Sequence, residues 1–183
     1  KRGLFASAGA VADANAVTID DYVADVASWV GAIRDRTGAG CVWLAGHSEG
    51  GLVALAAAQE VDALCGLVLI AAPGRPLGVI MREQLEANPA NAPVLADATA
   101  AIARLEAGER VDVAGFHPAL QTLFAPQVQG FLIDIFARDP AALAAASDLP
   151  LLILQGAKDV QVALADAEAL HAAVSCPRHA LRA

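Results

Sequence analysis

The segment between residues 41 and 59 constrains the fold most, because its character changes abruptly at a glycine-rich turn. It opens with CVWLA (41–45), an apolar run with the length and composition of a buried β-strand. The turn GHSEGG (46–51) follows, and the chain continues as LVALAAAQ (52–59), a stretch of strong helix formers. A strand must therefore lead through one sharp turn directly into a helix.

The same alternation continues along the chain. The runs LCGLVLIA (64–71) and LLILQ (151–155) are further buried strands, and a last strand is expected to start at 179. Apolar residues at helical spacing predict helices over 23–33 and 164–174. Continuous apolar strands that alternate with helices predict an α/β fold, with a parallel sheet covered on both faces.

The pattern changes between residues 75 and 147, where strands are absent. Helical segments over 79–87, 94–107 and 127–136 are separated by prolines, which predicts a helical insertion that could form a cap. The predicted parts are 1–74 (core with the glycine-rich turn), 75–147 (helical cap insertion) and 148–183 (core with an acid-bearing loop).

Charge and composition exclude several classes of partner. The net charge of −8 and the two lysines argue against a nucleic-acid partner, which needs clustered basic residues. No apolar run reaches the length of a membrane span. No His, Cys and Asp side chains stand at metal-ligand spacing, so no metal is expected. Oligomeric state and compartment stay open.

The three cysteines have no CxxC spacing and are too few for a disulfide framework. The favoured interpretation is that Cys41, Cys65 and Cys176 are small buried apolar side chains. A disulfide between Cys41 and Cys65 stays open, because each of them opens a predicted strand.

The glycine-rich turn contains the motif G-x-S-x-G at Gly46, Ser48 and Gly50. Between a strand and a helix, this motif places a nucleophilic serine on a strained turn above the sheet edge. Glycines without Cβ atoms let strand and helix approach closely. The backbone N–H of Glu49, at the helix start, is the predicted oxyanion-hole donor. The alternative is an ordinary glycine-rich turn, although the run lacks the G-x-G-x-x-G of a dinucleotide site.

The segments AGHSEGG (45–51) and AAPGRPL (71–77) resemble the α/β-hydrolase family, and most closely its bacterial members of the lysophospholipase or serine-aminopeptidase type with a helical insertion. The resemblance covers nearly the whole chain. It implies a Ser-Asp-His triad in that chain order, a carboxylic-ester substrate of small size, an acyl-serine intermediate and no cofactor. The alternatives are a non-catalytic binding member or inactive fragment of the fold, or a hydrolase of thioesters or amides.

The acid of such a triad follows a later strand, and LLILQGAKDVQV fits this pattern with Asp159 in the loop. At the carboxyl end of a parallel strand, Asp159 can face the same crevice as Ser48 and orient an imidazole. Asp166, within a helix, and Asp148, before the strand, are the weaker candidates.

No histidine stands where the resemblance expects the base. His47 is the neighbour of Ser48 and cannot easily turn to accept its proton, and His171 belongs to the last helix. His117 lies in the insertion. His179 follows the acid in the right order, but at the start of the last strand rather than after it.

The opening KRGLFASA resembles a family turn that earlier strands precede, with Phe5 where glycine is usual. We therefore expect a piece of a longer protein, with the catalytic histidine beyond Ala183 and the second oxyanion donor before Lys1. In such an enzyme the insertion could roof an acyl pocket or have a core of its own. The residues that serve either role are Leu120, Leu123, Phe124, Phe131 and Phe136.

Overall fold

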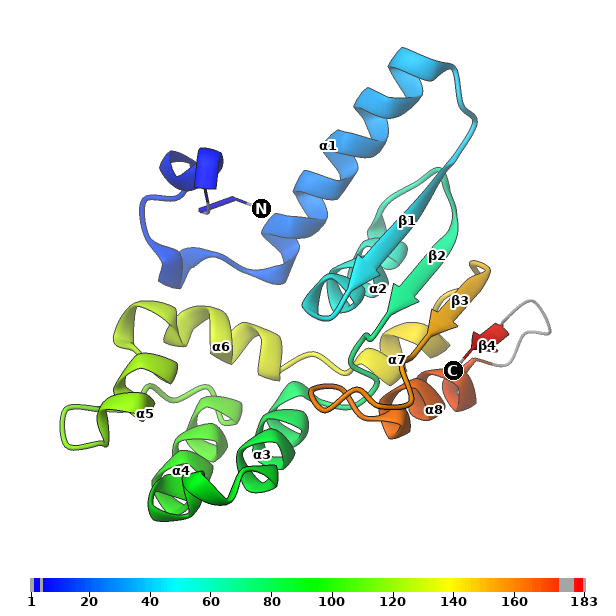
Figure 1. The fold of residues 1–183 in the computed structure, drawn as a ribbon. Helices are drawn as coiled ribbons and strands as arrows, with labels where there is room; N and C mark the ends of the chain where they lie inside the picture. The colour runs from blue at the N-terminus through cyan, green and yellow to red at the C-terminus, as the bar shows by residue number, and fades with distance from the viewer. Residues whose placement is uncertain (1, 4, 175–179, 183) are drawn as a thin grey trace. The chain divides into compact units, whose positions relative to one another are not determined.

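The computed structural model describes residues 2–3, 5–174 and 180–182. The chain divides into two compact units. One consists of Lys1–Ile19 and Pro76–Arg138 and is called the helical unit here; the other consists of Asp20–Arg75 and Asp139–Ala183 and is called the sheet unit. Figure 1 shows the elements of both.

The sheet unit is built on four parallel strands in the order β1-β2-β3-β4. Parallel pairing is possible because a crossover containing a helix separates β1 from β2 and β3 from β4. The predicted strands are confirmed to within a few residues, and the observed bounds are Val42–His47 (β1), Leu64–Ile70 (β2), Leu151–Leu154 (β3) and Ala180–Arg182 (β4).

Helices of the sheet unit cover one face of the sheet (Figure 1). Helix α2 packs on β1 and β2, α8 packs on β3 and β4, and α7 lies between α2 and α8. Helix α1 contributes Val26 and Val30 to the same core. The bounds are Ile19–Thr37 (α1), Glu49–Glu60 (α2), Pro140–Ala145 (α7) and Leu164–Ala173 (α8).

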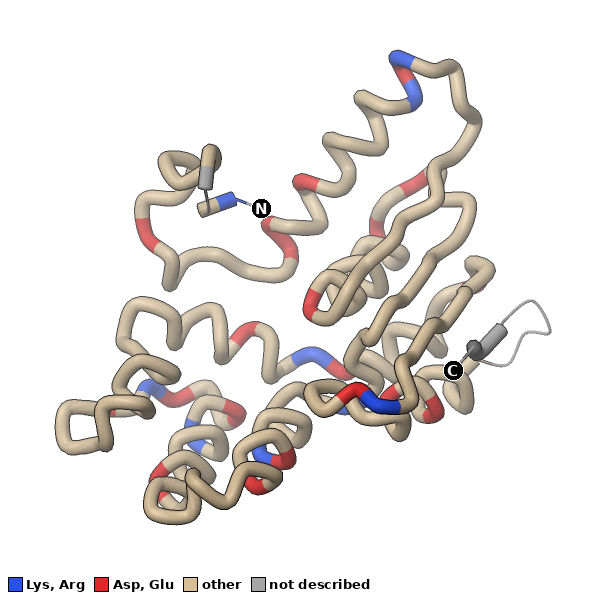
Figure 2. Tube along the Cα trace, in the orientation of Figure 1, with Lys and Arg blue, Asp and Glu red and all other residues tan. Residues whose placement is uncertain are grey.

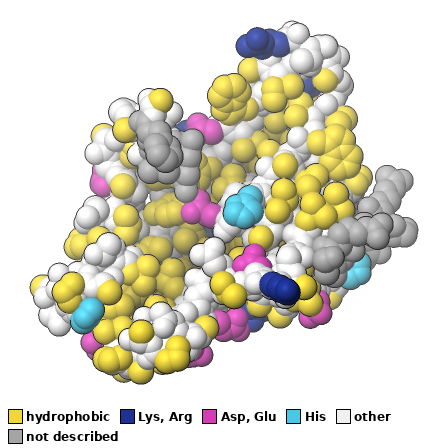
Figure 3. Space-filling view, in the orientation of Figure 1, with side chains coloured by type: hydrophobic (Ala, Val, Ile, Leu, Met, Phe, Trp, Pro, Cys, Tyr) yellow, Lys and Arg dark blue, Asp and Glu magenta, His cyan; other side chains and the backbone are white. Residues whose placement is uncertain are grey.

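Strand side chains alternate between this core and the opposite face. Leu67, Leu69 and Ile153 are at most 2% exposed, and burying each such side chain contributes about 1.5–3 kcal/mol. On the opposite face Trp43 is 56% and Ile70 37% exposed, and Figure 3 shows hydrophobic side chains gathered over β1 and β2. The prediction of a sheet covered on both faces thus holds for one face among the described residues.

The helical unit contains the three helices predicted for the insertion, and several short elements that were not predicted. The six-residue helix α5, like α7 of the sheet unit, begins at a proline and is too short to show a period. The bounds are Phe5–Ala10 (η1), Ala14–Ala16 (η2), Leu77–Ala87 (α3), Pro89–Val94 (η3), Leu95–Glu106 (α4), Pro118–Leu123 (α5), Pro126–Val128 (η4) and Gln129–Phe136 (α6).

The helical unit has its own core, which includes residues considered for a pocket lining. Leu120, Phe124 and Phe136 are buried, whereas Leu123 and Phe131 are half-buried. Buried Gln129 accepts from the Val111 N–H and donates to the carbonyl oxygens of Val111 and Phe124, all at 2.8 Å. That this unit roofs the site stays a prediction.

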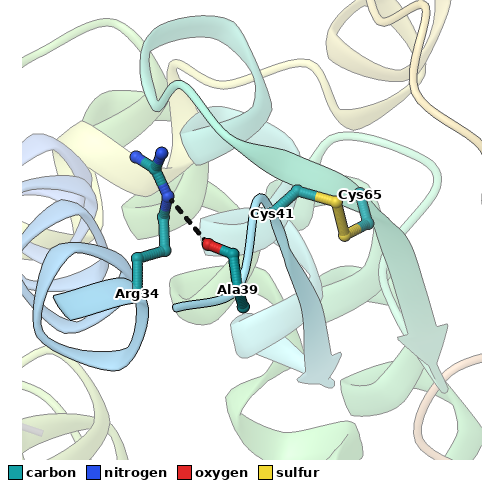
Figure 4. The surroundings of a disulfide bond; sticks show 4 residues. All are labelled: Arg34, Ala39, Cys41 and Cys65. Carbon is teal, nitrogen blue, oxygen red and sulfur yellow. Dashed lines mark hydrogen bonds between the residues drawn. A yellow bond between two sulfur atoms is a disulfide. The ribbon is translucent and has the colours of Figure 1, made fainter. Parts of the chain in front are cut away.

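The favoured interpretation of the cysteines was wrong for Cys41 and Cys65, whereas the alternative that had stayed open is confirmed. Cys41 and Cys65 form a disulfide with a Cα–Cα distance of 5.1 Å, and Cys41 is exposed (Figure 4). Parallel pairing aligns Val42 with Leu64 and so brings the two strand starts together. The Arg34 side chain donates to the Ala39 carbonyl in the preceding turn. Cys176 lies outside the described residues.

Charged residues are spread along the chain, with acidic residues interspersed among the basic ones (Figure 2). The exclusion of a nucleic-acid partner stays a prediction. Within the described ranges, no helix combines the length and apolarity that a membrane crossing requires.

Candidate active site

Ser48 sits on the sharp turn between β1 and α2. Its backbone has φ 51° and ψ −124°, a conformation that costs a non-glycine residue about 1–3 kcal/mol. Two hydrogen bonds hold the turn: the Ser48 N–H donates to the Ile70 carbonyl at 2.9 Å, and the Gly51 N–H donates to the Ser48 carbonyl at 2.8 Å. Strain sustained in this way is a common property of functional turns.

Two of the turn's glycines are required by close approaches. A Cβ at Gly46 would lie 2.1 Å from the Gly50 carbonyl oxygen, and one at Gly51 would lie 2.3 Å from the Ala72 Cβ. A Cβ at Gly50 would meet no atom within 4 Å. The sequence predicted a steric requirement at Gly46, Gly50 and Gly51; it is confirmed for Gly46 and Gly51 and wrong for Gly50, which contributes the backbone that Gly46 approaches.

Glu49 is the first residue of α2. Its backbone N–H lies in the first turn, where helical N–H groups point out of the helix and the macrodipole is positive. A first-turn N–H beside Ser48 is suitably placed to donate to an oxyanion, and the assignment of Glu49 to this role stays a prediction.

Asp159 lies in the loop between β3 and α8. Its Oδ1 accepts from the backbone N–H groups of Gln161 at 2.8 Å and Val162 at 3.1 Å. These two hydrogen bonds, with smaller contributions from Gln155 and the charge of His47, lower the pKa of the Asp159 carboxyl. Asp159 is therefore an ionised carboxylate at neutral pH, as an acid that stabilises an imidazolium must be.

The strand register places Ser48 and Asp159 at the same edge of the sheet. His47 pairs with Ile70, and Ile70 pairs with Leu154, so these residues form a row at the carboxyl ends of β1, β2 and β3. Ser48 follows that row directly, and Asp159 follows it in the next loop. Two strand spacings separate β1 from β3 by about 10 Å, which leaves room for a bridging side chain.

The two weaker acid candidates occupy different environments. Asp166 is fully buried in the first turn of α8, where it pairs with Arg75 at 2.8 Å. Asp148 is exposed before β3.

Within the described ranges, no histidine side chain is hydrogen-bonded to Ser48 or to the Asp159 carboxylate, although His47 is near enough for its charge to affect the Asp159 pKa. His47 is exposed at the end of β1, and His171 is exposed in the last turn of α8. His117 caps α5 in the helical unit, where its Nδ1 accepts from the Ala119 N–H. His179 lies outside the described residues.

Sequence reasoning missed Gln155, which shapes the acid loop. It is 4% exposed, and its Nε2 donates to the Val162 carbonyl at 2.8 Å. The signal was present, since Gln155 is the polar residue at the end of the predicted apolar strand 151–155. For metals, the described residues contain no group of three or more His, Cys, Asp or Glu that could bind an ion.

A family comparison is decisive for the classification. The sequence pattern of the family described as serine aminopeptidase, S33, matches residues 2–182. The chain belongs to this α/β-hydrolase family. Esterase EstD of Thermotoga maritima is 29% identical over 157 residues, which are 85% of this chain and 36% of the esterase.

Solved structures show the same fold. An α/β fold family hydrolase from Bacillus anthracis aligns with a TM-score of 0.55 at 15% identity, over 94% of this chain and 68% of its own. A lipase-esterase related protein from Clostridium acetobutylicum aligns with a TM-score of 0.54 at 15% identity, over 90% of this chain and 65% of its own. A thermophilic esterase from Thermogutta terrifontis aligns with a TM-score of 0.52 at 23% identity, over 90% of this chain and 62% of its own. The chain thus spans about a third of its curated relative and about two thirds of these structures.

Proposed function

We propose that this α/β-hydrolase chain carries the nucleophile and the acid of a serine hydrolase that cleaves carboxylic esters of small molecules. The observation that carries the proposal is the strained backbone of Ser48 between β1 and α2, held by Gly46 and by the Ile70 carbonyl. Such a turn raises a serine Oγ above the edge of the sheet. The similarity to an esterase favours esters over amides.

The proposed reaction has two steps. The Ser48 Oγ attacks the ester carbonyl while a histidine removes its proton, and the Glu49 N–H stabilises the oxyanion. The alcohol leaves with that proton, and water then cleaves the acyl-serine to release the carboxylic acid. Asp159 holds the imidazole and stabilises its charged form.

The proposed reaction also requires a base and a second oxyanion donor. We propose a histidine that follows β4 in the complete protein, because a loop there would join the carboxyl-edge row formed by His47, Ile70 and Leu154. The second donor is expected from a loop that precedes Lys1.

The test compares Ser48→Ala with Ser28→Ala in the complete protein. Ser28 is exposed on α1 and its hydroxyl donates to the Ala24 carbonyl at 3.0 Å, so its loss leaves the sheet edge unchanged. With p-nitrophenyl esters, Ser48→Ala should lower kcat by at least about 10⁴-fold, and Ser28→Ala should leave it unchanged. A Ser48→Ala variant that keeps its activity would contradict the proposal. Parallel assays with thioester and anilide analogues test the choice of bond.

A further inference from the structure

An ion pair with a buried carboxylate connects the loop after β2 to the first turn of α8, which directly follows the loop that carries Asp159. The Asp166 carboxylate is 0% exposed. Its Oδ1 accepts from the Gly74 N–H and the Arg75 N–H, both at 3.1 Å, and from the Arg75 Nε at 3.2 Å. Its Oδ2 accepts from an Arg75 Nη at 2.8 Å. Four donors, two of them from one guanidinium, give this carboxylate a fixed orientation.

The backbone approach at Gly74 is equally tight. A Cβ on Gly74 would lie 1.9 Å from the Asp166 carbonyl oxygen and 3.0 Å from the Leu170 Cγ. The loop after β2 therefore lies directly on the first turn of α8, and no side chain larger than hydrogen fits between them.

The loop after β2 also contacts the turn that carries the proposed nucleophile, Ser48. Ala72, two residues before Gly74, is in the close approach that requires a glycine at position 51 of α2. The Ser48 N–H is bonded to the Ile70 carbonyl at the end of β2. The loop after β2 thus touches the serine turn at its start and Asp166 at its end.

Asp166 is also connected to the loop that carries the proposed acid, Asp159. The Asp166 N–H donates to the Ala163 carbonyl at 3.0 Å, one residue after Val162. Val162 is bonded to the Asp159 carboxylate through its N–H and to Gln155 through its carbonyl. The position of Asp166 therefore fixes the end of the loop that carries Asp159.

We propose that the Arg75–Asp166 pair is a positioning device that holds the Asp159 loop in place relative to the Ser48 turn. This inference rests on the serine-hydrolase function proposed above. A purely structural pair would change the folded fraction when it is broken, but not the turnover of each folded molecule. Displacement of reacting groups by about 1 Å can cost about 100-fold in rate, so a positioning pair should change turnover.

The test is a double-mutant cycle in the complete protein, with Asp166→Asn and Asp159→Asn made singly and together. Asp166→Asn should lower kcat of folded enzyme about 10- to 100-fold with KM changed less than about twofold. In the Asp159→Asn background it should have almost no further effect, because the loop then carries no acid to position. Equal effects in both backgrounds, or an unchanged kcat, would overturn the proposal.

Arg75→Gln is the second variant, because the Asp166 side chain is fully buried whereas the Arg75 side chain is 24% exposed and can relax into solvent. It should reproduce the effect of Asp166→Asn on kcat. The matched control is Arg82→Gln in the helical unit, where Arg82 pairs with Glu106 and is also 24% exposed. A similar loss of kcat in this control would show that the effect is not specific to the acid loop and would overturn the proposal.

Labelling of Ser48 by a fluorophosphonate separates the two hypotheses. A wild-type protein that neither reacts with the probe nor hydrolyses esters contradicts the proposed function, and the positioning role with it. A wild type that does both, with variants of unchanged kcat, contradicts the positioning role alone.

Discussion

The Cys41–Cys65 disulfide should contribute measurably to the stability of the sheet unit. The two cysteines are 24 residues apart in the sequence. A closed loop of about that length lowers the entropy of the unfolded chain by about 11.6 cal/mol/K, which is about 3.4 kcal/mol at 25 °C. We therefore expect the double variant Cys41→Ser and Cys65→Ser to unfold more easily by about that free energy.

Urea denaturation followed by tryptophan fluorescence measures this difference. Both tryptophans of the chain, Trp29 and Trp43, belong to the sheet unit, so the signal reports on that unit. With a slope of about 2 kcal/mol/M, the midpoint should fall by about 1.7 M. The wild type treated with a reducing agent should match the double variant, and the double variant should not respond to the reducing agent.

The disulfide prediction has a clear refutation. If the oxidised wild type and the double variant have the same midpoint, the entropic argument fails. If the mass of the isolated protein shows both thiols free, the pairing itself is wrong.

Three further predictions concern single substitutions. Gly46→Ala should lower kcat more than about 100-fold, because its Cβ would clash with the Gly50 carbonyl; normal kinetics would contradict the steric argument. Asp159→Asn should lower the free energy of unfolding at neutral pH, because hydrogen bonds hold the pKa of this carboxyl in the folded protein below its ordinary value of 3.8. The stability that the ionised carboxylate contributes is present above that value and is lost as the pH falls through the folded pKa. Thermal melts from pH 7 to 2 should show the two curves converging, and a constant gap would contradict this. Gln129→Leu should lower the free energy of unfolding by about 1–3 kcal/mol, because it leaves the Val111 N–H buried and unpaired; chemical denaturation measures this loss.

The parts of the fold that sequence reasoning predicted depend on local patterns. Strands β1, β2 and β3 are continuous apolar runs, and Gly46 and Ser48 form a recognisable motif between a strand and a helix. The loop position of Asp159 was predicted because that loop follows a strand that was itself recognised; its catalytic role stays a prediction. Each inference needed only neighbouring residues.

The features that were missed depend on contacts between distant residues. The sequence indicated that Asp166 lies in a helix, which made it a weaker candidate for the acid. It did not indicate the partner of Asp166, because Arg75 is 91 residues away. The disulfide depends on the register that places Cys41 beside Cys65. Helix α7 is six residues long, too short for a periodic signal.

The assignment of Ser48 as the nucleophile is the central claim, and covalent labelling tests it most directly. The complete protein would be treated with a fluorophosphonate and digested, and the modified peptide would be sequenced by mass spectrometry. The strained turn at Ser48 predicts one adduct on that residue, which is lost in Ser48→Ala and retained in Ser28→Ala. A protein that hydrolyses esters but carries its adduct on another serine would contradict the claim.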